Sequence, residues 1–415
     1  MKIFIKTFGC RTNIYDSELL KSYITKANIL VDDENSADII VVNSCTVTNG
    51  ADSDVRNYIN RLNALNKKVI LTGCGASSQG AKLLNHNKIS GVFGASYKHK
   101  INDFLKNEKF FELGELDYKE NEIIKGFERH SKGFIKIQEG CDFSCSYCII
   151  PSVRGKARSL DERLILNQAQ ILIQNGFSEL VLTGTNIGSY GKDNNSSLAK
   201  LLKKISTING LKRVRLGSLE PSQIDKEFKE ILNESWLERH LHIALQHTSQ
   251  TMLSLMRRAN KAWRDKELFY ELSELGFALG TDYIVAHPGE SDEIFDEAVS
   301  NFKKLPITHL HGFIFSPREG TRSALMLENS PKINGKIAKE RLKILKNISD
   351  LNNFKFRSKK PKLQVLCEKL DNDGYYSGFD QFYNKIKIKS NQNLSKKWVE
   401  ISEYEVEFSN NVAKL

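Results

Sequence analysis

The sequence lacks any apolar run that approaches the length of about 18–20 residues needed to cross a bilayer. Its first residues, Met1 to Lys6, lack the apolar core and small-residue cleavage site of a signal peptide. These absences predict a cytoplasmic protein without a membrane partner. Wholesale disorder is excluded, because 40% of the 415 residues are hydrophobic and can build cores. The length allows two or three domains of about 100–200 residues each.

The sequence also lacks a disulfide framework, because cysteines stay reduced in the compartment predicted here. Six of the seven cysteines fall into two groups of three. One group, called here the N-terminal trio, comprises Cys10, Cys45 and Cys74, and the other, the loop trio, comprises Cys141, Cys145 and Cys148. The seventh, Cys367, lies alone beside an apolar stretch and is expected to be a small packed residue.

The sequence has fewer acidic residues than basic ones. The formal net charge is +11 and the isoelectric point is about 9.1. Such an excess suits a polyanionic partner, because neutralising phosphates releases counterions. The alternative is a general bias toward lysine, with solvated side chains that keep the protein soluble. Charge alone favours a nucleic acid over this alternative only weakly.

Strands and helices alternate in the first third of the chain. Residues 2–7, 38–43 and 68–72 are β-rich apolar runs, and Asp16-Ser17-Glu18 opens an amphipathic helix that extends through Ile24. Continuous apolar strands separated by helices predict a parallel sheet that is covered on both faces.

Each cysteine of the N-terminal trio follows one of these three strands. In an open α/β sheet the loops after the strands gather at one edge, where ligands bind. The topology therefore predicts that three thiols distant in sequence lie close together. The alternative is three unrelated loop cysteines.

A second series of strand–helix units is predicted after a charged, poorly periodic connector at residues 106–131, in which one or two short strands are expected. Strands are predicted at residues 133–138, 179–182, 213–216, 242–245, 281–285 and 310–315. Helices such as 161–174 and 292–305 lie between them. Six such units predict a partial barrel of parallel strands with its active site at their carboxyl ends.

The last part of the chain has a different pattern. A basic helix is predicted at residues 335–360, and short alternating runs such as 384–389 and 403–408 predict strands with one solvated face. A small antiparallel barrel fits this pattern, and such barrels often bind single-stranded nucleic acid. The alternative is a structural cap whose lysines face water.

The predicted fold is therefore α/β in three parts. An open parallel-sheet (Rossmann-like) domain spans residues 1–105, and the connector spans residues 106–131. A partial (β/α)6 barrel spans residues 132–350, and a small antiparallel β-barrel spans residues 360–415.

The loop trio has the spacing CxxxCxxC within a single short segment, Gly140 to Cys148. Zinc prefers four ligands, commonly in paired CxxC units, and no matching pair follows. Three thiolates instead suit a [4Fe–4S] cluster with one iron that no protein ligand occupies. That iron can hold the amino and carboxylate groups of S-adenosylmethionine (SAM), which the reduced cluster then cleaves to a carbon radical. The loop resembles the radical SAM motif, and structural zinc is the alternative.

Motifs along almost the whole chain resemble those of the methylthiotransferase family of radical SAM enzymes. The matching segments are Phe8 to Asn13 with Tyr15 to Glu18, Asn43 to Thr48, Thr72 to Cys74, Lys136 to Pro151 and Arg154 to Ser159. The tail is similar to the family's TRAM domain, a small β-barrel that binds RNA. The resemblance implies a second [4Fe–4S] cluster on the N-terminal trio, and that this cluster carries sulfur.

Three segments are most similar to the branch that acts on N6-threonylcarbamoyladenosine beside the tRNA anticodon. They are Leu182 to Gly191, Arg213 to Pro221 and Ser316 to Arg322. The resemblance implies that one SAM methylates the sulfur and a second supplies a radical that removes hydrogen from C2 of the adenine. The methylthio group then joins that carbon, which has no proton acidic enough for ordinary acid–base catalysis.

Two other substrates stay open within the family, namely isopentenyladenosine in tRNA and an aspartate of a ribosomal protein. A non-catalytic RNA-binding protein with structural metal sites is a further alternative. The expected partners are the tRNA anticodon loop and an electron donor such as flavodoxin or ferredoxin, and DNA is not expected.

Candidate site residues lie mainly at the predicted strand ends. Those expected to contact SAM are Tyr147, Gly184, Thr185, Asn186, Ser218, Glu220 and Gln246. Those expected to contact RNA are Arg154, Arg158, Lys385, Lys387 and Lys389. The alternatives are a plain turn for Gly184, helix capping for the polar residues and surface salt bridges for the arginines.

Two segments depart from the family pattern. Gln246-His247-Thr248-Ser249 stands where Gln-Ser-Gly-Ser is common, and Ala286-His287-Pro288-Gly289-Glu290 replaces Gly-Phe-Pro-Gly-Glu. Ala286 adds a methyl group where a backbone is expected to approach a ligand, so the contacts there are expected to differ.

Overall fold

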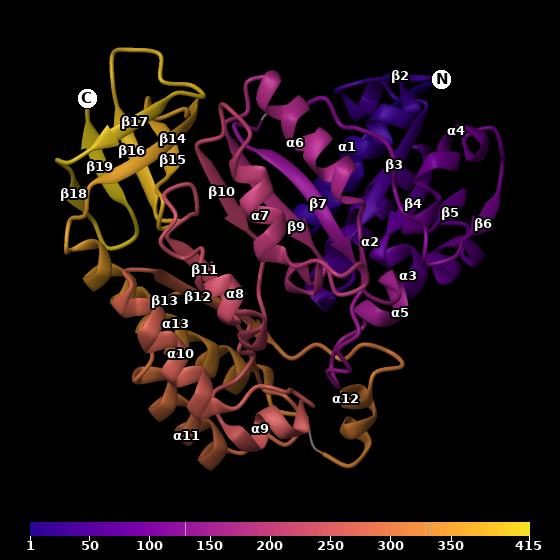
Figure 1. Ribbon diagram of the computed structural model, residues 1–415. Helices are drawn as coiled ribbons and strands as arrows, with labels where there is room; N and C mark the ends of the chain where they lie inside the picture. Colours follow the sequence, from indigo (N-terminus) through magenta and orange to yellow (C-terminus); the bar gives the residue numbers. More distant parts are fainter. Residues whose placement is uncertain (129, 331) are drawn as a thin grey trace.

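The computed structural model describes residues 1–128, 130–330 and 332–415 (Figure 1). Arg129 of the predicted connector and Pro331 of the predicted barrel domain lie outside the described residues. Parallel sheets build the N-terminal and central parts, and a curled, mostly antiparallel sheet builds the C-terminal part, shown in yellow in Figure 1. The predicted fold class is thus confirmed. Among the described residues, no helix is both long enough and apolar enough to span a membrane.

The first sheet has six parallel strands in the order β2-β1-β3-β4-β5-β6. Their bounds are β1 Lys2–Thr7, β2 Ile29–Leu30, β3 Ile39–Ser44, β4 Lys68–Gly73, β5 Gly91–Phe93 and β6 Phe110–Glu112. The three predicted strands are β1, β3 and β4. Every residue of β3 is buried, as expected of a strand with helices on both faces. The short strand expected in the connector is β6, which pairs with β5 at the edge.

The helices of this part are α1 Arg11–Ile24, α2 Asn49–Ala64, α3 Cys74–Asn85 and α4 Ile101–Phe104. The first helix begins at Arg11, so its predicted start at Asp16 was wrong. The helix starts earlier because Cys10 is extended and its carbonyl accepts a bond from the backbone N–H of Ile14 at 3.2 Å. Asp16 therefore lies inside the helix, where its buried carboxylate forms ion pairs.

The central part contains the six parallel strands predicted for a partial barrel. They are β7 Gly133–Glu139, β9 Glu179–Gly184, β10 Arg213–Leu216, β11 His240–His242, β12 Ala278–Val285 and β13 Ile307–Ile314. A short strand, β8 Arg158–Ser159, pairs antiparallel with β7. Single bridges, Val214 to Leu237 and Leu219 to Ile243, join the β7–β9–β10 group to the β11–β12–β13 group.

One predicted strand is displaced. β11 ends at His242, whereas residues 242–245 were predicted, because the chain beyond this point leaves regular pairing. Among the described residues only isolated bridges follow, Ile243 to Leu219 and Gln246 to Tyr283, and the φ angle of Gln246 is 68°. A positive φ at a non-glycine residue breaks a strand.

Helices connect the barrel strands and cover them. They are α5 Ile150–Arg154, α6 Glu162–Gln174, α7 Leu198–Ser206, α8 Lys226–Lys229, α9 Gln250–Leu255, α10 Ala262–Glu274, α11 Asp292–Lys303, α12 Arg322–Leu325 and α13 Gly335–Arg357. The three predicted helices are α6, α11 and α13. Side chains that accept backbone N–H bonds cap all three, Asp161 at α6, Ser291 at α11 and Asn334 at α13.

The C-terminal sheet has the strand order β17-β14-β15-β16-β19-β18. Its strands are β14 Leu363–Leu370, β15 Tyr376–Phe379, β16 Lys385–Lys389, β17 Trp398–Ile401, β18 Glu405–Val406 and β19 Asn411–Lys414. The pair β16–β19 is parallel, so the prediction of a purely antiparallel barrel was wrong at this pair. The sheet is fixed to the barrel by bonds such as Trp398 Nε1 to Ser178 Oγ at 2.7 Å and Arg215 Nη2 to the Asp380 carbonyl at 2.7 Å.

One continuous hydrophobic core joins the first sheet to the barrel. It contains Leu19 and Leu20 of α1 together with Ile135 of β7 and Leu180 of β9, all fully or almost fully buried. A second hydrophobic core, which includes Ile40, lies on the opposite face of the first sheet. The carboxyl edge of the first sheet is thereby held against the barrel, which brings the two cysteine trios into one region.

Candidate active site between two cysteine trios

The N-terminal trio lies at the carboxyl edge of the first sheet. Cys10 precedes α1, Cys45 directly follows β3, and Cys74 is the first residue of α3. The thiols are close enough that ionised Cys10 and Cys74 would raise the pKa of Cys45. Gly9 has a φ of +109°, and a Cβ there would lie 2.6 Å from the Cβ of Cys45. Glycine at this position is therefore what lets the Cys10 loop approach Cys45.

Burial controls the protonation of these thiols. It raises the pKa of Cys45 to about 11, and it raises the pKa of Cys74, with the charge of Arg154 acting in the opposite direction. Both thiols would stay protonated at neutral pH in the absence of iron. Thiolates would form here if a metal took the place of the proton.

Arg154, at the end of α5, links the two trios. Its Nε donates to Cys74 Sγ at 3.1 Å, its Nη1 to Asp16 Oδ2 at 2.8 Å and its Nη2 to Asn13 Oδ1 at 2.9 Å. Only 1% of the residue is exposed. The prediction that Arg154 contacts RNA was wrong, because these bonds and this burial leave no accessible face.

Arg154 is part of a buried charge network that the sequence analysis missed. Three cations, Lys98, Lys136 and Arg154, meet three carboxylates, Asp16, Glu120 and Glu139. Burial by itself would raise the pKa of Asp16, but the three cations hold it well below its usual range. The network joins α1 and the connector to β7, so it fixes the first sheet against the barrel. The lysine at position 136, in the middle of an apolar strand, was the sequence signal that could have indicated this network.

Arg158 is also occupied within the protein. Its Nη2 lies 3.1 Å from Glu139 Oε2, and its Nη1 donates to the Arg154 carbonyl at 2.8 Å. Since only 10% of its side chain is exposed, the prediction that it contacts RNA was wrong as well. Lys385, Lys387 and Lys389 lie on β16, where Lys385 and Lys389 are exposed and Lys387 is half-buried.

The loop trio lies between β7 and α5. The backbone N–H of Cys141 donates to the Gly155 carbonyl at 3.0 Å, and that of Cys148 donates to the Cys145 carbonyl at 3.2 Å. Gly140 has a φ of +75°, and a Cβ there would lie 1.9 Å from the Lys156 carbonyl oxygen. The loop can pass this close to the returning chain only because position 140 is glycine.

Two side chains direct N–H groups at this trio, one just after β9 and one in the segment between α9 and α10. Asn186 Nδ2 lies 3.6 Å from Cys141 Sγ, and Arg258 Nη1 lies 3.6 Å from Cys145 Sγ. Arg258, which the sequence analysis missed, also forms a two-bond ion pair with Glu220. A buried arginine beside the thiol suits a site that must stabilise negative charge on sulfur, and Glu220 holds that arginine in position.

The predicted segment from Gly184 to Asn186 lies against the base of the loop trio. Thr185 Oγ1 donates to the Gly140 carbonyl at 2.6 Å, and the backbone N–H of Asn186 donates to Gln138 Oε1 at 2.8 Å. A Cβ on Gly184 would lie 2.6 Å from the carbonyl oxygen of Gln138. These contacts give Gly184 and Thr185 a structural role in β7–β9 packing, and Gln138 is a further residue that the sequence analysis missed.

The other predicted SAM residues are distributed around the barrel mouth. Gly184 and Ser218 share one cavity with Cys10, whereas Glu220 lies beside Cys145 in a separate hollow of about 400 Å³. Tyr147 packs against Met252, Met256 and Ile284. Gln246 holds a left-handed backbone conformation at the end of its strand, and its N–H donates to the Asp282 carbonyl at 2.9 Å.

The two segments that depart from the family pattern are buried at His247, Ala286 and His287, and these residues make polar contacts within the protein. His287 Nε2 lies 2.7 Å from Ser323 Oγ, which lies 2.8 Å from Ser146 Oγ in the loop trio segment. His247 Nε2 lies 3.4 Å from Glu290 Oε1. Ala286 has a φ of 61°, and its N–H donates to Glu290. A left-handed conformation gives a physical reason for the glycine that the family commonly has there.

A cavity of about 520 Å³ opens between the first sheet, the barrel and the C-terminal sheet. Cys10, Arg11 and Thr12 line it from α1, Ser218 and Glu238 from the barrel, and Tyr383 from the C-terminal sheet. Four histidines of β11 and β13 complete the wall, namely His240, His242, His309 and His311. The size is that of a site for a small molecule or a single nucleoside.

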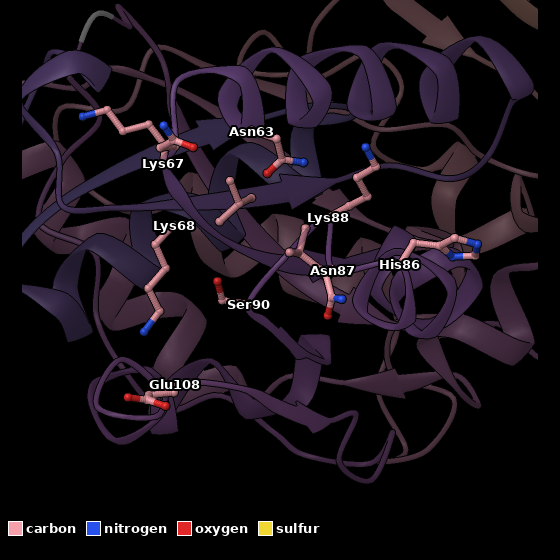
Figure 2. A pocket seen from close by; sticks show the side chains of 11 residues that line it. Asn63, Lys67, Lys68, His86, Asn87, Lys88, Ser90 and Glu108 are labelled. Carbon is pink, nitrogen blue, oxygen red and sulfur yellow. The ribbon is translucent and has the colours of Figure 1, made fainter.

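A second hollow, of about 580 Å³, lies at the amino ends of β4 and β5 (Figure 2). Lys67 and Lys68 at its wall donate to the backbone carbonyls of Ala37 and Asn107. Ligands of open α/β sheets bind at the carboxyl ends of the strands. This hollow is therefore not part of the candidate site.

The residues of both trios fit iron–sulfur clusters. Each trio offers three thiols, and N–H groups from Arg154, Asn186 and Arg258 lie near the sulfur atoms. In the part of the chain that the structure describes, no three His, Cys, Asp or Glu side chains are placed to hold a single metal ion. The two trios therefore fit iron–sulfur clusters, in which each thiolate binds a different iron, and not a site for a single metal ion.

Comparisons with known proteins identify the family. A sequence model of an uncharacterised protein family, UPF0004, matches residues 2–94, and a model of the radical SAM superfamily matches residues 135–302. A Helicobacter pylori protein with the provisional name methylthiotransferase is 47% identical over 99% of both chains. The threonylcarbamoyladenosine tRNA methylthiotransferase MtaB of Aquifex aeolicus is 36% identical over 86% of this chain and 90% of its own. The chain belongs to the radical SAM methylthiotransferases.

The family resemblance stated from the motifs is thereby confirmed. Membership gives the enzyme SAM and a [4Fe–4S] cluster as cofactors. The tRNA-2-methylthio-N(6)-dimethylallyladenosine synthase of Campylobacter hominis is also similar, with 34% identity over 83% of this chain and 82% of its own. Among solved structures, the radical SAM methyltransferase TsrM of Kitasatospora setae has a similar fold. Its TM-score is 0.58 at 15% identity, over 79% of this chain and 78% of that one.

Proposed function

We propose that the enzyme is a tRNA methylthiotransferase that adds a methylthio group to C2 of N6-threonylcarbamoyladenosine beside the anticodon. The observation that carries the proposal is the cavity that Cys10 of the N-terminal trio shares with Gly184 and Ser218 of the barrel. A base in this cavity would lie beside Cys10, and Gly184 in its wall leads directly to Thr185 and Asn186, which contact Gly140 and Cys141 of the loop-trio segment. The similarity to MtaB of Aquifex aeolicus supports the choice of nucleoside.

In this proposal each trio holds one [4Fe–4S] cluster. The loop-trio cluster would bind SAM, with Tyr147, Gly184, Thr185, Asn186, Ser218, Glu220 and Gln246 around it. When bound, the two clusters and SAM supply one-electron chemistry that removes hydrogen from an unactivated carbon, together with a source of sulfur.

The chain's own residues would stabilise charge and orient the ligands. Asn186 and Arg258 donate toward Cys141 and Cys145, so they lower the free energy of negatively charged sulfur there. Glu220 holds Arg258 in place through its two-bond ion pair. Arg154 acts likewise on Cys74, and its fully buried position keeps water away from that thiolate.

The C-terminal sheet would hold the RNA. Lys385 and Lys389 expose positive charge on β16, and Lys387 lies between them. An anticodon loop is single-stranded, so a base can turn out into the cavity without breaking a helix. We further expect flavodoxin or ferredoxin to supply the electron.

The isopentenyladenosine substrate is the main competing proposal. It is favoured by the Campylobacter hominis relative, whose identity of 34% is close to the 36% of the MtaB relative. Sequence identity therefore does not distinguish between the two nucleosides, so a measurement on tRNA is needed to decide between them.

The deciding experiment is mass spectrometry of tRNA nucleosides from a strain that lacks the gene. We expect methylthio-threonylcarbamoyladenosine to disappear and to return when the intact gene is supplied, but not when Cys141→Ala is supplied. If the nucleoside persists in a strain with no second methylthiotransferase, the assigned substrate is wrong. Loss of methylthio-isopentenyladenosine instead would establish the competing proposal.

A further inference from the structure

Arg11 is a cation without a carboxylate partner in the wall of the cavity. Its Nη1 donates to the Leu216 carbonyl at 3.3 Å and its Nη2 donates to the Tyr383 hydroxyl at 2.8 Å. The guanidinium carbon lies 5.4 Å from the centre of the Tyr383 ring. Among the described residues, only these neutral groups bond to Arg11, so its charge is available to a ligand.

The carboxylate nearest in the cavity wall is already engaged. Glu238 Oε1 accepts the Leu216 N–H at 2.6 Å, and its Oε2 accepts from Arg215 Nη1 at 3.0 Å. Only 2% of Glu238 is exposed. Its hydrogen bonds are thus directed at β10, and Arg11 acts on it only through its charge, which opposes the rise that burial causes in the pKa of Glu238.

A second polar group in the same wall lacks a partner. His240 is 6% exposed, and its Nε2 has no hydrogen-bond partner among the residues that the structure describes. Its ring stacks on that of Tyr383, with centroids 5.2 Å apart and an interplanar angle of 22°. Burial holds the pKa of His240 well below its usual range, so the ring is neutral and can donate or accept one hydrogen bond. An unpaired buried polar atom is costly, and a ligand in the cavity would satisfy it.

We propose that Arg11, Tyr383 and His240 form a subsite that binds a carboxylate on the N6 substituent of the target adenine. This inference rests on the proposed function. Arg11 directly follows Cys10, so a base placed at the N-terminal trio presents its substituent to the guanidinium. Arginine binds carboxylates through paired N–H bonds, and the tyrosine hydroxyl fixes its orientation.

The subsite also explains how an apolar substituent would be rejected. An isopentenyl group offers neither charge nor hydrogen bonds, so it would bury the Arg11 charge without compensation. Sites built to hydrogen-bond a polar group discriminate strongly against analogues that lack it. The three residues come from the first sheet's α1, the C-terminal sheet and the barrel, so the subsite exists only in the assembled protein.

The test uses the full-length, cluster-loaded enzyme without reductant and three synthetic anticodon stem–loops. One carries threonylcarbamoyladenosine, one carries its methyl ester, which removes the negative charge and adds one methyl group, and one carries isopentenyladenosine. Fluorescence anisotropy gives each Kd. We expect the wild-type enzyme to bind the acid about 10- to 100-fold more tightly than the ester. Arg11→Gln should bind the two equally, whereas Arg11→Lys and Tyr383→Phe should retain part of the preference.

Lys389→Gln is the matched control, because it removes an exposed charge outside the cavity and should weaken all three RNAs by the same factor. Equal iron content and melting temperature of Arg11→Gln and wild type exclude misfolding as the cause. An unchanged acid-to-ester ratio in Arg11→Gln, with methylthiolation of the acid stem–loop intact in the wild type, overturns the subsite alone. Methylthiolation of only the isopentenyl stem–loop overturns both the subsite and the proposed nucleoside.

Discussion

Arg154 donates its Nε hydrogen to the Sγ atom of Cys74 at 3.1 Å, although the two residues are 80 positions apart in the sequence. Cys74 begins α3 at the edge of the first sheet, and Arg154 ends the helix that follows the loop trio. The bond therefore couples the two cysteine trios through a single guanidinium. It also makes Arg154 a residue whose removal has a predictable effect.

Arg154→Gln should destabilise the protein strongly. The substitution leaves the three buried carboxylates of the network with only two of its three cations, Lys98 and Lys136, and removing one partner of a buried ion pair costs about 3–5 kcal/mol. Urea unfolding followed by circular dichroism measures the loss. Arg56→Gln is the control, because Arg56 is exposed on α2 and, among the described residues, bonds only to Ser53; it should change stability by less than about 0.5 kcal/mol. Equal effects of the two substitutions would refute the coupling.

The two trios should contribute separately to the iron content. After anaerobic reconstitution we expect about eight irons per chain in the wild type, and about four when Cys10, Cys45 and Cys74 are all replaced by alanine. Cys367→Ala is the matched control, because this thiol is fully buried within the C-terminal sheet and away from both trios. Iron and acid-labile sulfide analysis gives the counts. Zinc in place of iron in the wild type would contradict the assignment of clusters.

The stability of the protein should fall as the medium becomes acidic, in part because of His287. Burial lowers the pKa of His287 from 6.5 to about 4. The unfolded chain therefore binds more protons than the folded one between these values, and the free energy of unfolding decreases as pH falls through this window. Between pH 7 and pH 5 this histidine accounts for about 2 kcal/mol.

The variant His287→Phe should show a smaller loss than the wild type over the same pH range, measured by urea unfolding at pH 7 and pH 5. Some loss should persist, because burial also lowers the pKa of His309 to about 4. His86→Gln, at the exposed end of α3, serves as the control and should behave like the wild type. A pH dependence identical in all three proteins would show that His287 does not titrate as described.

Lysines of β16 should govern the salt dependence of RNA binding. Replacing Lys385, Lys387 and Lys389 with glutamine should weaken binding of an anticodon stem–loop and lower the slope of log K against log salt by up to about 2, since each phosphate contact to a single strand contributes about 0.7. The control variant replaces Lys200, Lys203 and Lys204 of α7 with glutamine, which removes the same amount of charge. Each of these three lysines is paired with a glutamate. An unaltered slope in the β16 variant would place the RNA elsewhere.

The sequence predicted the arrangement of strands well because buried parallel strands are short, apolar and regularly interrupted by helices. It also predicted that Cys10, Cys45 and Cys74 follow three strand ends, since that depends only on local order. Glycine at position 9 could be noted in advance, but its contact with Cys45 depends on how two distant loops meet.

Long-range pairings could not be predicted in the same way. Arg154 and Arg158 have the residue type expected at an RNA surface, and only the docking of α1 against β7 shows that their charges are neutralised inside the protein. Arg258 and Gln138 were missed because neither stands in a distinctive motif, and each acquires its role from a partner in a loop distant in sequence. The parallel pairing of β16 with β19 likewise depends on the path of the intervening chain.

The hydrophobic core that runs unbroken from α1 into β7 and β9 limits how the enzyme can be divided. A fragment ending near residue 105 would present Leu19, Leu20 and Ile24 to water, and the remaining chain would present the matching face of β7. Each piece would aggregate, which light scattering would reveal, so the N-terminal part cannot be exchanged between relatives as an independent module. Recombination near residue 105 must instead preserve both packed faces, so we expect these two faces to evolve together.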